Sequence, residues 1–156
     1  MKKILFMALV IAISSTYIYA QEEEYIEPKP TKEAVREHCE KFIDCIISGK
    51  LEQALTYMAA EYVRDQHDIF LGGATNQFLR EFLAGNSLVG DDFIVPDNIS
   101  DIDSIKITEI RIDPDEFEFR ANIIFEIKLT TGERYSVDVY MSIDERGRLV
   151  FLGAVG

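Results

Sequence analysis

Residues 117–143 read FEFRANIIFEIKLTTGERYSVDVYMSI, and this stretch decides the fold of the chain. Apolar side chains occupy every second position on both sides of a central Thr-Gly-Glu triplet. They are Phe117, Phe119, Ala121, Ile123, Phe125, Ile127 and Leu129, followed by Tyr135, Val137, Val139, Met141 and Ile143. Because successive side chains of a strand point to opposite faces, this period predicts two long antiparallel strands with one face toward a core.

The turns at the two ends of the first long strand are constrained by the same alternation. A four-residue turn, DPDE, would set Ile112 opposite Phe117. Farther on, Leu129 and Tyr135 need the same face of the sheet. The loop between the two long strands must therefore contain an odd number of residues, or a bulge must lie beside it.

Two further strands are predicted, one before and one after this hairpin along the chain. In residues 103–112 the alternation slips at residues 108–109, and a β-bulge there would restore one common face. The five-residue turn DERGR pairs Ile143 with Leu149. The final segment, LVFLGAV, is apolar at both parities, which is typical of a strand that is covered on both faces or central in its sheet.

Residues 31–83 are predicted to form three helices that cover the sheet. Thr31 can cap the first helix, whose apolar positions make one stripe that ends before Gly49. The second helix is predicted over residues 51–62 and the third over residues 76–83. The stripe of the first helix consists of Val35, Cys39, Phe42, Ile43, Ile46 and Ile47.

Cys39 and Cys45 are the two cysteines of the chain. On a helix, a separation of six residues puts them roughly 9 Å apart along the axis and on different faces. They cannot form a disulfide with each other without breaking that helix. We therefore predict two buried, reduced thiols.

The first twenty residues, MKKILFMALVIAISSTYIYA, have the pattern of a secretory signal peptide. Two lysines precede an apolar run that ends at Ile13, which is too short to cross a bilayer. We expect cleavage after Ala20 and no stable membrane anchor afterwards. Residues 21–30 would form an acidic, proline-marked flexible leader, and residues 31–156 one domain in the periplasm or secreted from the cell.

The charge of the chain argues against two kinds of partner. Its formal net charge is −12. A domain this acidic is repelled by phosphate backbones and by anionic lipid. We therefore expect no nucleic-acid partner and no binding to a membrane surface.

The predicted order of elements resembles that of the NTF2-like (cystatin-like α+β) superfamily. FIDCIISGKLEQALTYMAAEY, residues 42–62, is similar to its first helix, glycine corner and second helix, and NQFLREFLAG, residues 76–85, to its third helix. The resemblance covers nearly all of the chain after Pro30. It implies three helices packed on a curved antiparallel sheet, in a cone whose open end can hold a ligand. Lys50 departs from the acidic residue that the family commonly has after the glycine.

The resemblance places a possible ligand inside the cone, between the helices and the first long strand. The aromatic and sulfur-containing side chains expected there are Tyr57, Met58, Tyr62, Phe78 and Phe119. The same side chains could instead fill the interior, because protein interiors are close packed. The sequence leaves both arrangements open, and we favour the filled one.

Enzymes of this superfamily work by proton transfer, with acidic, tyrosine or histidine groups tuned by an apolar pocket. The candidates in this chain are His67 or Asp68 as the base and Tyr57 or Tyr62 as the proton donor. The surrounding sequence, DQHD, is strongly polar. We favour the interpretation that it forms a solvated turn.

No metal site and no cofactor is predicted. Asp65, His67 and Asp68 lack a second cluster that would complete a cation site, and no glycine-rich phosphate loop follows a strand. His38 lies beside the apolar stripe of the first helix. We predict that it is a partly buried, structural histidine.

Two functional hypotheses remain. We favour a non-catalytic exported NTF2-like domain that binds a small apolar ligand or a protein partner. The resemblance implies a homodimer through the outer face of the sheet, and Ile124 and Tyr140 would be the apolar centre of that contact. The alternative is a proton-transfer enzyme of the isomerase or dehydratase type, with its site in the cone.

Overall fold

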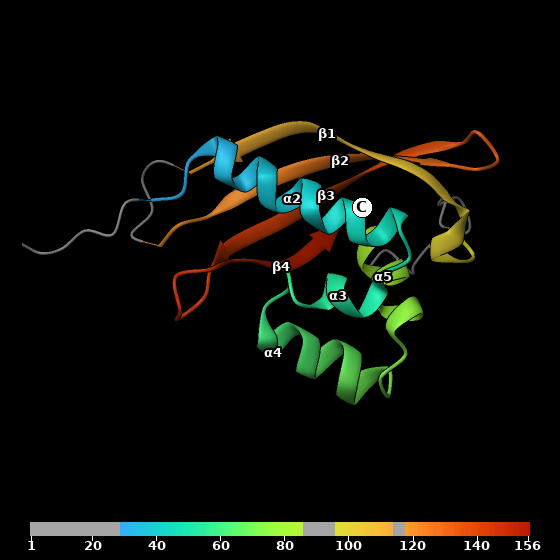
Figure 1. The fold of residues 1–156 in the computed structure, drawn as a ribbon, viewed down its shortest axis with the longest axis horizontal. Helices are drawn as coiled ribbons and strands as arrows, with labels where there is room; N and C mark the ends of the chain where they lie inside the picture. Colours follow the sequence, from blue (N-terminus) through green and yellow to red (C-terminus); the bar gives the residue numbers. More distant parts are fainter. Residues whose placement is uncertain (1–28, 86–95, 114–117) are drawn as a thin grey trace, which may run out of the picture.

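The computed structural model describes residues 29–85, 96–113 and 118–156, so the predicted signal peptide lies outside it, as does the leader apart from its last two residues. Helices come first: α2 (Lys32–Ile47), α3 (Leu51–Leu55), α4 (Ala60–Tyr62), the π-helix η1 (Val63–Phe70), α5 (Thr75–Leu83) and the 3-10 helix η2 (Ile99–Asp101). The strands are β1 (Ile102–Ile112), β2 (Ala121–Leu129), β3 (Arg134–Ile143) and β4 (Leu149–Val155). The predicted α+β class is confirmed (Figure 1).

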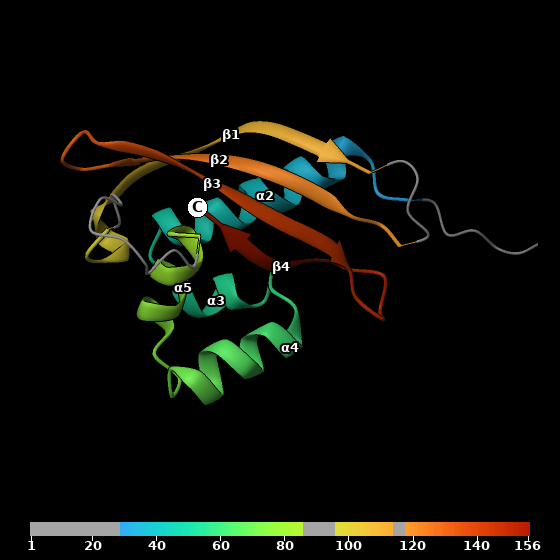
Figure 2. The same cartoon turned by 180° about the vertical axis from the view of Figure 1, so that it is seen from behind.

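The strands of the described ranges form one antiparallel sheet in the order β1-β2-β3-β4. Helix α2 lies along one face of this sheet (Figure 1), and the view from behind shows the strands in front of it (Figure 2). The predicted period of two is confirmed in β2, where Ile123, Phe125 and Ile127 are fully buried and the residues between them are half-buried. One face of the hairpin therefore packs into the core.

The turn between β1 and β2 differs from the prediction. Ile112 pairs with Ala121, and the Asp113 N–H donates to the Arg120 carbonyl at 3.1 Å. The predicted pairing of Ile112 with Phe117 is therefore wrong, and Phe117 itself lies outside the described residues. The connection is longer than four residues because β2 begins four positions later than the alternation suggested.

The two other register predictions are confirmed. The pairing of β1 with β2 shifts between Ile107 and Glu109, where the β-bulge was expected. At the tip of the hairpin, the Leu129 N–H donates to the Glu133 carbonyl at 2.9 Å. The loop between them therefore has three residues, and Gly132 adopts the left-handed φ of 95° that this tight turn requires.

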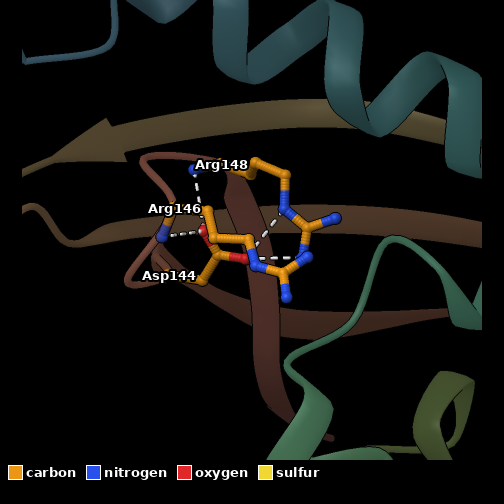
Figure 3. Close-up of polar contacts among 3 residues, drawn as sticks. All are labelled: Asp144, Arg146 and Arg148. Carbon is orange, nitrogen blue, oxygen red and sulfur yellow. Dashed lines mark hydrogen bonds and ion pairs between the residues drawn. The ribbon is translucent and has the colours of Figure 1, made fainter.

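The predicted turn between β3 and β4 is also confirmed, because Ile143 pairs with Leu149. Figure 3 shows how Asp144 holds it: Oδ1 accepts the backbone N–H groups of Arg146 and Arg148, both at 2.9 Å. Oδ2 accepts two bonds from the Arg148 guanidinium, at 2.9 and 2.6 Å. The side-chain bond to Arg148 is the main reason that the pKa of Asp144 is lowered.

β4 was expected to be central in the sheet or covered on both faces, and neither is correct. It is the last strand of the sheet, and Leu152 is 44% exposed. The register shifts beside Tyr140, so that Phe151 pairs with Met141 and Gly153 with Tyr140. This irregularity leaves Leu152 outside the regular ladder, which explains why apolar residues occur at both parities.

Helix α2 forms as its sequence predicts. Thr31 Oγ1 accepts the Ala34 N–H at 3.2 Å and caps the first turn. Cys39 and Cys45 are both buried and free, as predicted. Burial raises the pKa of the Cys39 thiol to about 12, and its Sγ lies 3.8 Å from the sulfur of Met141 on the sheet.

The predicted second helix is interrupted. Helix α3 ends at Leu55, and the chain then runs beside β4, where Met58 makes a parallel bridge with Phe151. The Phe151 N–H donates to the Tyr57 carbonyl at 2.9 Å, and the Ala59 N–H donates to the Phe151 carbonyl at 2.8 Å. The Ala59 N–H thus bonds the sheet edge, whereas the N–H groups of residues 56–58 still donate to carbonyls three residues earlier, and α4 and η1 follow.

Aromatic side chains fill the space between the helices and the sheet. Five phenylalanines are buried there, with at most 2% of each exposed, and they come from α2, α5, β2 and β4. They are Phe42, Phe78, Phe82, Phe125 and Phe151. Phe42 and Phe151 lie closest, with ring centroids 4.8 Å apart. Within the described ranges, no helix is both long and apolar enough to cross a membrane.

Candidate functional site

The face of the sheet opposite α2 presents mainly polar side chains with a few apolar ones. The strand pairing sets Asn122 opposite Tyr140 and Ile124 opposite Asp138. Because neighbours along a strand alternate between faces, these four side chains share the face that the helices leave open (Figure 2). Tyr140 is 40% exposed, which is unusual for a large apolar side chain in the middle of a strand.

A hollow of about 610 Å³ lies at one end of this face. Tyr140 and Leu152 supply exposed apolar surface, while Arg111 and Arg120 supply charge. Asn122 Oδ1 is buried and has no hydrogen-bond partner among the described residues. The full lining is Arg111, Ile112, Asp113, Arg120, Ala121, Asn122, Tyr140, Met141 and Leu152. The hollow therefore combines exposed apolar surface with charged groups.

Ion pairs balance the charges along the rest of the open face. Arg134 Nη1 lies 3.0 Å from Glu126 Oε1, and the Lys128 ammonium lies 2.6 Å from Asp103 Oδ2. The Arg111 guanidinium bonds both oxygens of Glu109, at 2.7 and 2.5 Å, and the side-chain bond lowers the pKa of Glu109. These acidic groups are thus matched by cations, although the whole chain has a net charge of −12.

The five residues expected around a ligand inside the cone do not share one site. Met58, Phe78 and Phe119 are buried with at most 4% exposed. The Tyr62 ring packs 5.5 Å from Phe78, whereas the Tyr57 ring packs against His38, 5.0 Å away, on the α2 side. Each of these side chains contributes to the packed core or its margin.

The catalytic candidates do not converge either. His67 is 7% exposed, so the prediction that it belongs to a solvated turn is wrong, although Asp65, Gln66 and Asp68 are exposed. Both ring nitrogens of His67 are engaged: Nδ1 lies 2.6 Å from Asp68 Oδ1 and Nε2 lies 2.9 Å from Thr75 Oγ1. Thr75 is itself buried, so neither nitrogen is presented to a substrate.

The tyrosines proposed as proton donors pack against different aromatic rings. Tyr62 and His67 contact the same ring, that of Phe78, with centroid distances of 5.5 Å each. Tyr57 instead contacts His38 and Phe42. Both nitrogens of His67 already contact Asp68 and Thr75, so the ring is not free to act as the base in proton transfer.

His38 is a half-buried histidine, as predicted, between the rings of Tyr57 and Phe151 at 5.0 and 5.4 Å. Burial lowers its pKa, and the backbone hydrogen bond to Tyr57 offsets part of that effect. In the described part of the chain, three or more His, Cys, Asp or Glu side chains do not gather as a metal-binding group.

Sequence reasoning missed several residues that matter here. Thr75 contacts His67 and donates to Glu52, and these two residues lie 8 and 15 positions from His67 and follow no motif. Leu152 was not singled out, because apolar residues occupy both parities of the last strand. That lack of alternation could itself have indicated an irregular strand. Comparisons with family models, curated proteins and solved structures find no match to this chain.

Proposed function

We propose that this chain is a non-catalytic, exported binding domain of NTF2-like architecture, whose binding surface is the open face of the sheet. The observation that carries the proposal is the hollow beside Tyr140 and Leu152, which combines exposed apolar surface with the charged groups of Arg111 and Arg120. Sites for small molecules are typically concave and apolar, with a few polar groups that fix orientation. A small apolar ligand or an apolar side chain of a protein partner fits this description.

The packing of the interior supports a site on the outside. A cone that holds a ligand needs an open end between its helices and sheet, whereas five buried phenylalanines occupy that space here. The helices before the sheet and the long antiparallel strands support the NTF2-like part of the proposal. The apolar segment at residues 1–20 supports export.

We further propose that the protein partner is a second copy of the chain. Two such acidic copies repel, and contact through a charge-balanced face reduces that repulsion. Strands of about 30 Å, in a sheet about 19 Å wide, offer roughly 600 Å² per copy. This approaches the ~800 Å² per partner of a standard interface. Ile124 and Tyr140 form the apolar centre of the contact.

Light scattering of the mature domain tests the dimer. We expect the wild type to have the mass of two chains at micromolar concentration, and Ile124→Arg and Tyr140→Arg to have the mass of one. Ile47→Arg is the matched control, because Ile47 is 49% exposed at the end of α2 and outside the sheet. A monomeric wild type, or a dimer that both sheet variants leave intact, would contradict this partner.

A fluorescent apolar probe, anilinonaphthalene sulfonate, tests the hollow. We expect saturable binding to the folded wild type that Leu152→Asp abolishes and Ile47→Arg preserves. Circular dichroism of each variant checks that it remains folded. A monomer that also gives no probe signal at the hollow would overturn the proposed function as a whole.

A further inference from the structure

Four side chains from three helical elements form a line of hydrogen bonds around His67. Asp68 and His67 come from η1, Thr75 opens α5, and Glu52 comes from α3. The contacts run from Asp68 Oδ1 to His67 Nδ1 at 2.6 Å and from His67 Nε2 to Thr75 Oγ1 at 2.9 Å. The line ends where Thr75 Oγ1 donates to Glu52 Oε1 at 2.7 Å. We call these four residues the His67 clamp.

A count of protons shows that the His67 clamp needs one more than its side chains ordinarily supply. Each of the three contacts requires one hydrogen between its two heavy atoms. The Thr75 hydroxyl provides one, a neutral imidazole provides one, and two ionised carboxylates provide none. When Thr75 donates to Glu52, both nitrogens of His67 must carry hydrogen, because each faces an acceptor.

We propose that the His67 clamp holds this third proton in the folded protein, so that the attachment of η1 to α3 and α5 depends on pH. With the proton present, all three contacts are hydrogen bonds, and two of them join a cation to an acceptor. Without it, one contact brings two acceptors together at hydrogen-bond distance. The clamp therefore stabilises the fold at lower pH and loses that contribution as pH rises.

The surroundings of the ring favour the charged clamp. Glu52 and Asp68 are the acidic groups that bound the line at its two ends, and a cation between two carboxylates is stabilised by both. The Phe78 ring packs edge-on at 5.5 Å and shields one side of the imidazole from water. Arg64, the nearby cation on η1, is bonded to Asp65 at 2.9 Å.

The His67 clamp attaches η1, an element that few other buried contacts hold in place. A π-helix is rare, and η1 has eight residues. It carries Ile69 and Phe70, each 72% exposed, whereas His67 is its one buried residue. Loss of the third proton therefore loosens the segment that displays these two apolar side chains.

Nuclear magnetic resonance of the two histidines tests the proton directly. Nitrogen-15 shifts distinguish an imidazolium from either neutral tautomer, and His38→Gln assigns the remaining signals to His67. Near pH 6.5 we expect both nitrogens of His67 to carry hydrogen while His38 is neutral. A neutral His67 with one protonated nitrogen under those conditions would overturn the proposal.

Glu52→Gln gives the sharpest comparison, because its amide supplies the missing hydrogen. The amide N–H₂ can donate to Thr75, which then donates to a neutral His67, which in turn donates to Asp68. Hydrogen exchange of the η1 amides, corrected for intrinsic rates, is the readout. From about pH 6 to 8 we expect wild-type protection to fall about tenfold and Glu52→Gln protection to stay constant.

Two threonine variants complete the test. Thr75→Val removes the central hydroxyl, and we expect weak η1 protection at every pH. Thr56→Val is the matched control on the same side of the molecule, since Thr56 bonds only the Gln53 carbonyl of its own turn, at 2.7 Å, among the described contacts. It should keep the wild-type pH dependence. The same pH dependence in wild type and Glu52→Gln would refute the His67 clamp.

Discussion

The same strands build two faces of opposite character. On the covered face, Phe125, Phe151 and Val139 are fully buried beneath the helices. On the open face, Glu126 and Tyr140 alternate with them along the chain and stay in contact with solvent. The two faces therefore differ in role. Apolar packing on one face determines the fold, and the other face remains exposed, where we propose that it binds a partner.

Truncation of a covered side chain should give the largest effect. Phe151 contacts Phe42, Phe82, Phe125 and His38, so Phe151→Ala leaves a cavity at the centre of the aromatic cluster. We expect a loss of about 3–5 kcal/mol in the free energy of unfolding, measured by urea denaturation.

The neighbouring residue provides the control. Leu152 is 44% exposed on the open face, and Leu152→Ala should change stability by less than about 1 kcal/mol. If Phe151→Ala does not fold, Phe151→Leu keeps most of the volume and should fall between the two. Equal losses at both positions would mean that the two faces do not differ as described.

The pH dependence of stability should reveal His38 on the covered face. Burial lowers its pKa, so the unfolded chain binds this proton more readily than the folded one. Stability should therefore fall as pH drops through about 6.5, the ordinary value of histidine, toward the lower folded value. His38→Gln should remove this part of the pH dependence in urea titrations at pH 7.5 and 5.5.

The sign of this effect distinguishes the two histidines. The His67 clamp is expected to stabilise the fold at lower pH, whereas buried neutral His38 destabilises it there. Substitution of His38 and of His67 should thus change the slope of stability against pH in opposite directions. If both substitutions changed the slope of stability against pH in the same direction, one of the two assignments would be wrong.

Much of the covered face could be predicted because its causes are local. The period of two in β2, the cap at Thr31 and the odd loop after Leu129 each depend on residues close together in sequence. The β-bulge near Glu109 was visible as a change of parity. Period, cap and register are properties of short segments, so they can be recognised without the tertiary structure.

Two features that sequence reasoning missed depend on distant contacts. The helical pattern of residues 51–62 was overridden at Met58 because β4, about ninety residues later, offers hydrogen bonds there. His67 is buried because Thr75, which donates to Glu52, contacts its Nε2, and the polar sequence DQHD does not reveal this partner. Long-range partners override local propensity in both cases.

The smallest effect is expected from the ion pairs of the open face, and it separates stability from binding. Arg134 and Glu126 lie 3.0 Å apart with 53% and 33% of their side chains exposed. An exposed pair contributes only about 0–1 kcal/mol, so Arg134→Gln should leave the urea midpoint nearly unchanged. The same substitution removes one cation from a face that we propose contacts its own copy.

Dimer dissociation, measured by light scattering against salt concentration, should therefore respond to Arg134→Gln more than unfolding does. The variant should dissociate at a higher protein concentration than the wild type, and added salt should reduce the difference because it screens the uncompensated Glu126 charges. Arg146→Gln, at the exposed tip of the β3–β4 turn, is the control for a change of net charge alone. Equal dissociation of both variants would show that the balance of charge on this face does not matter, and that the face binds through Ile124 and Tyr140 alone.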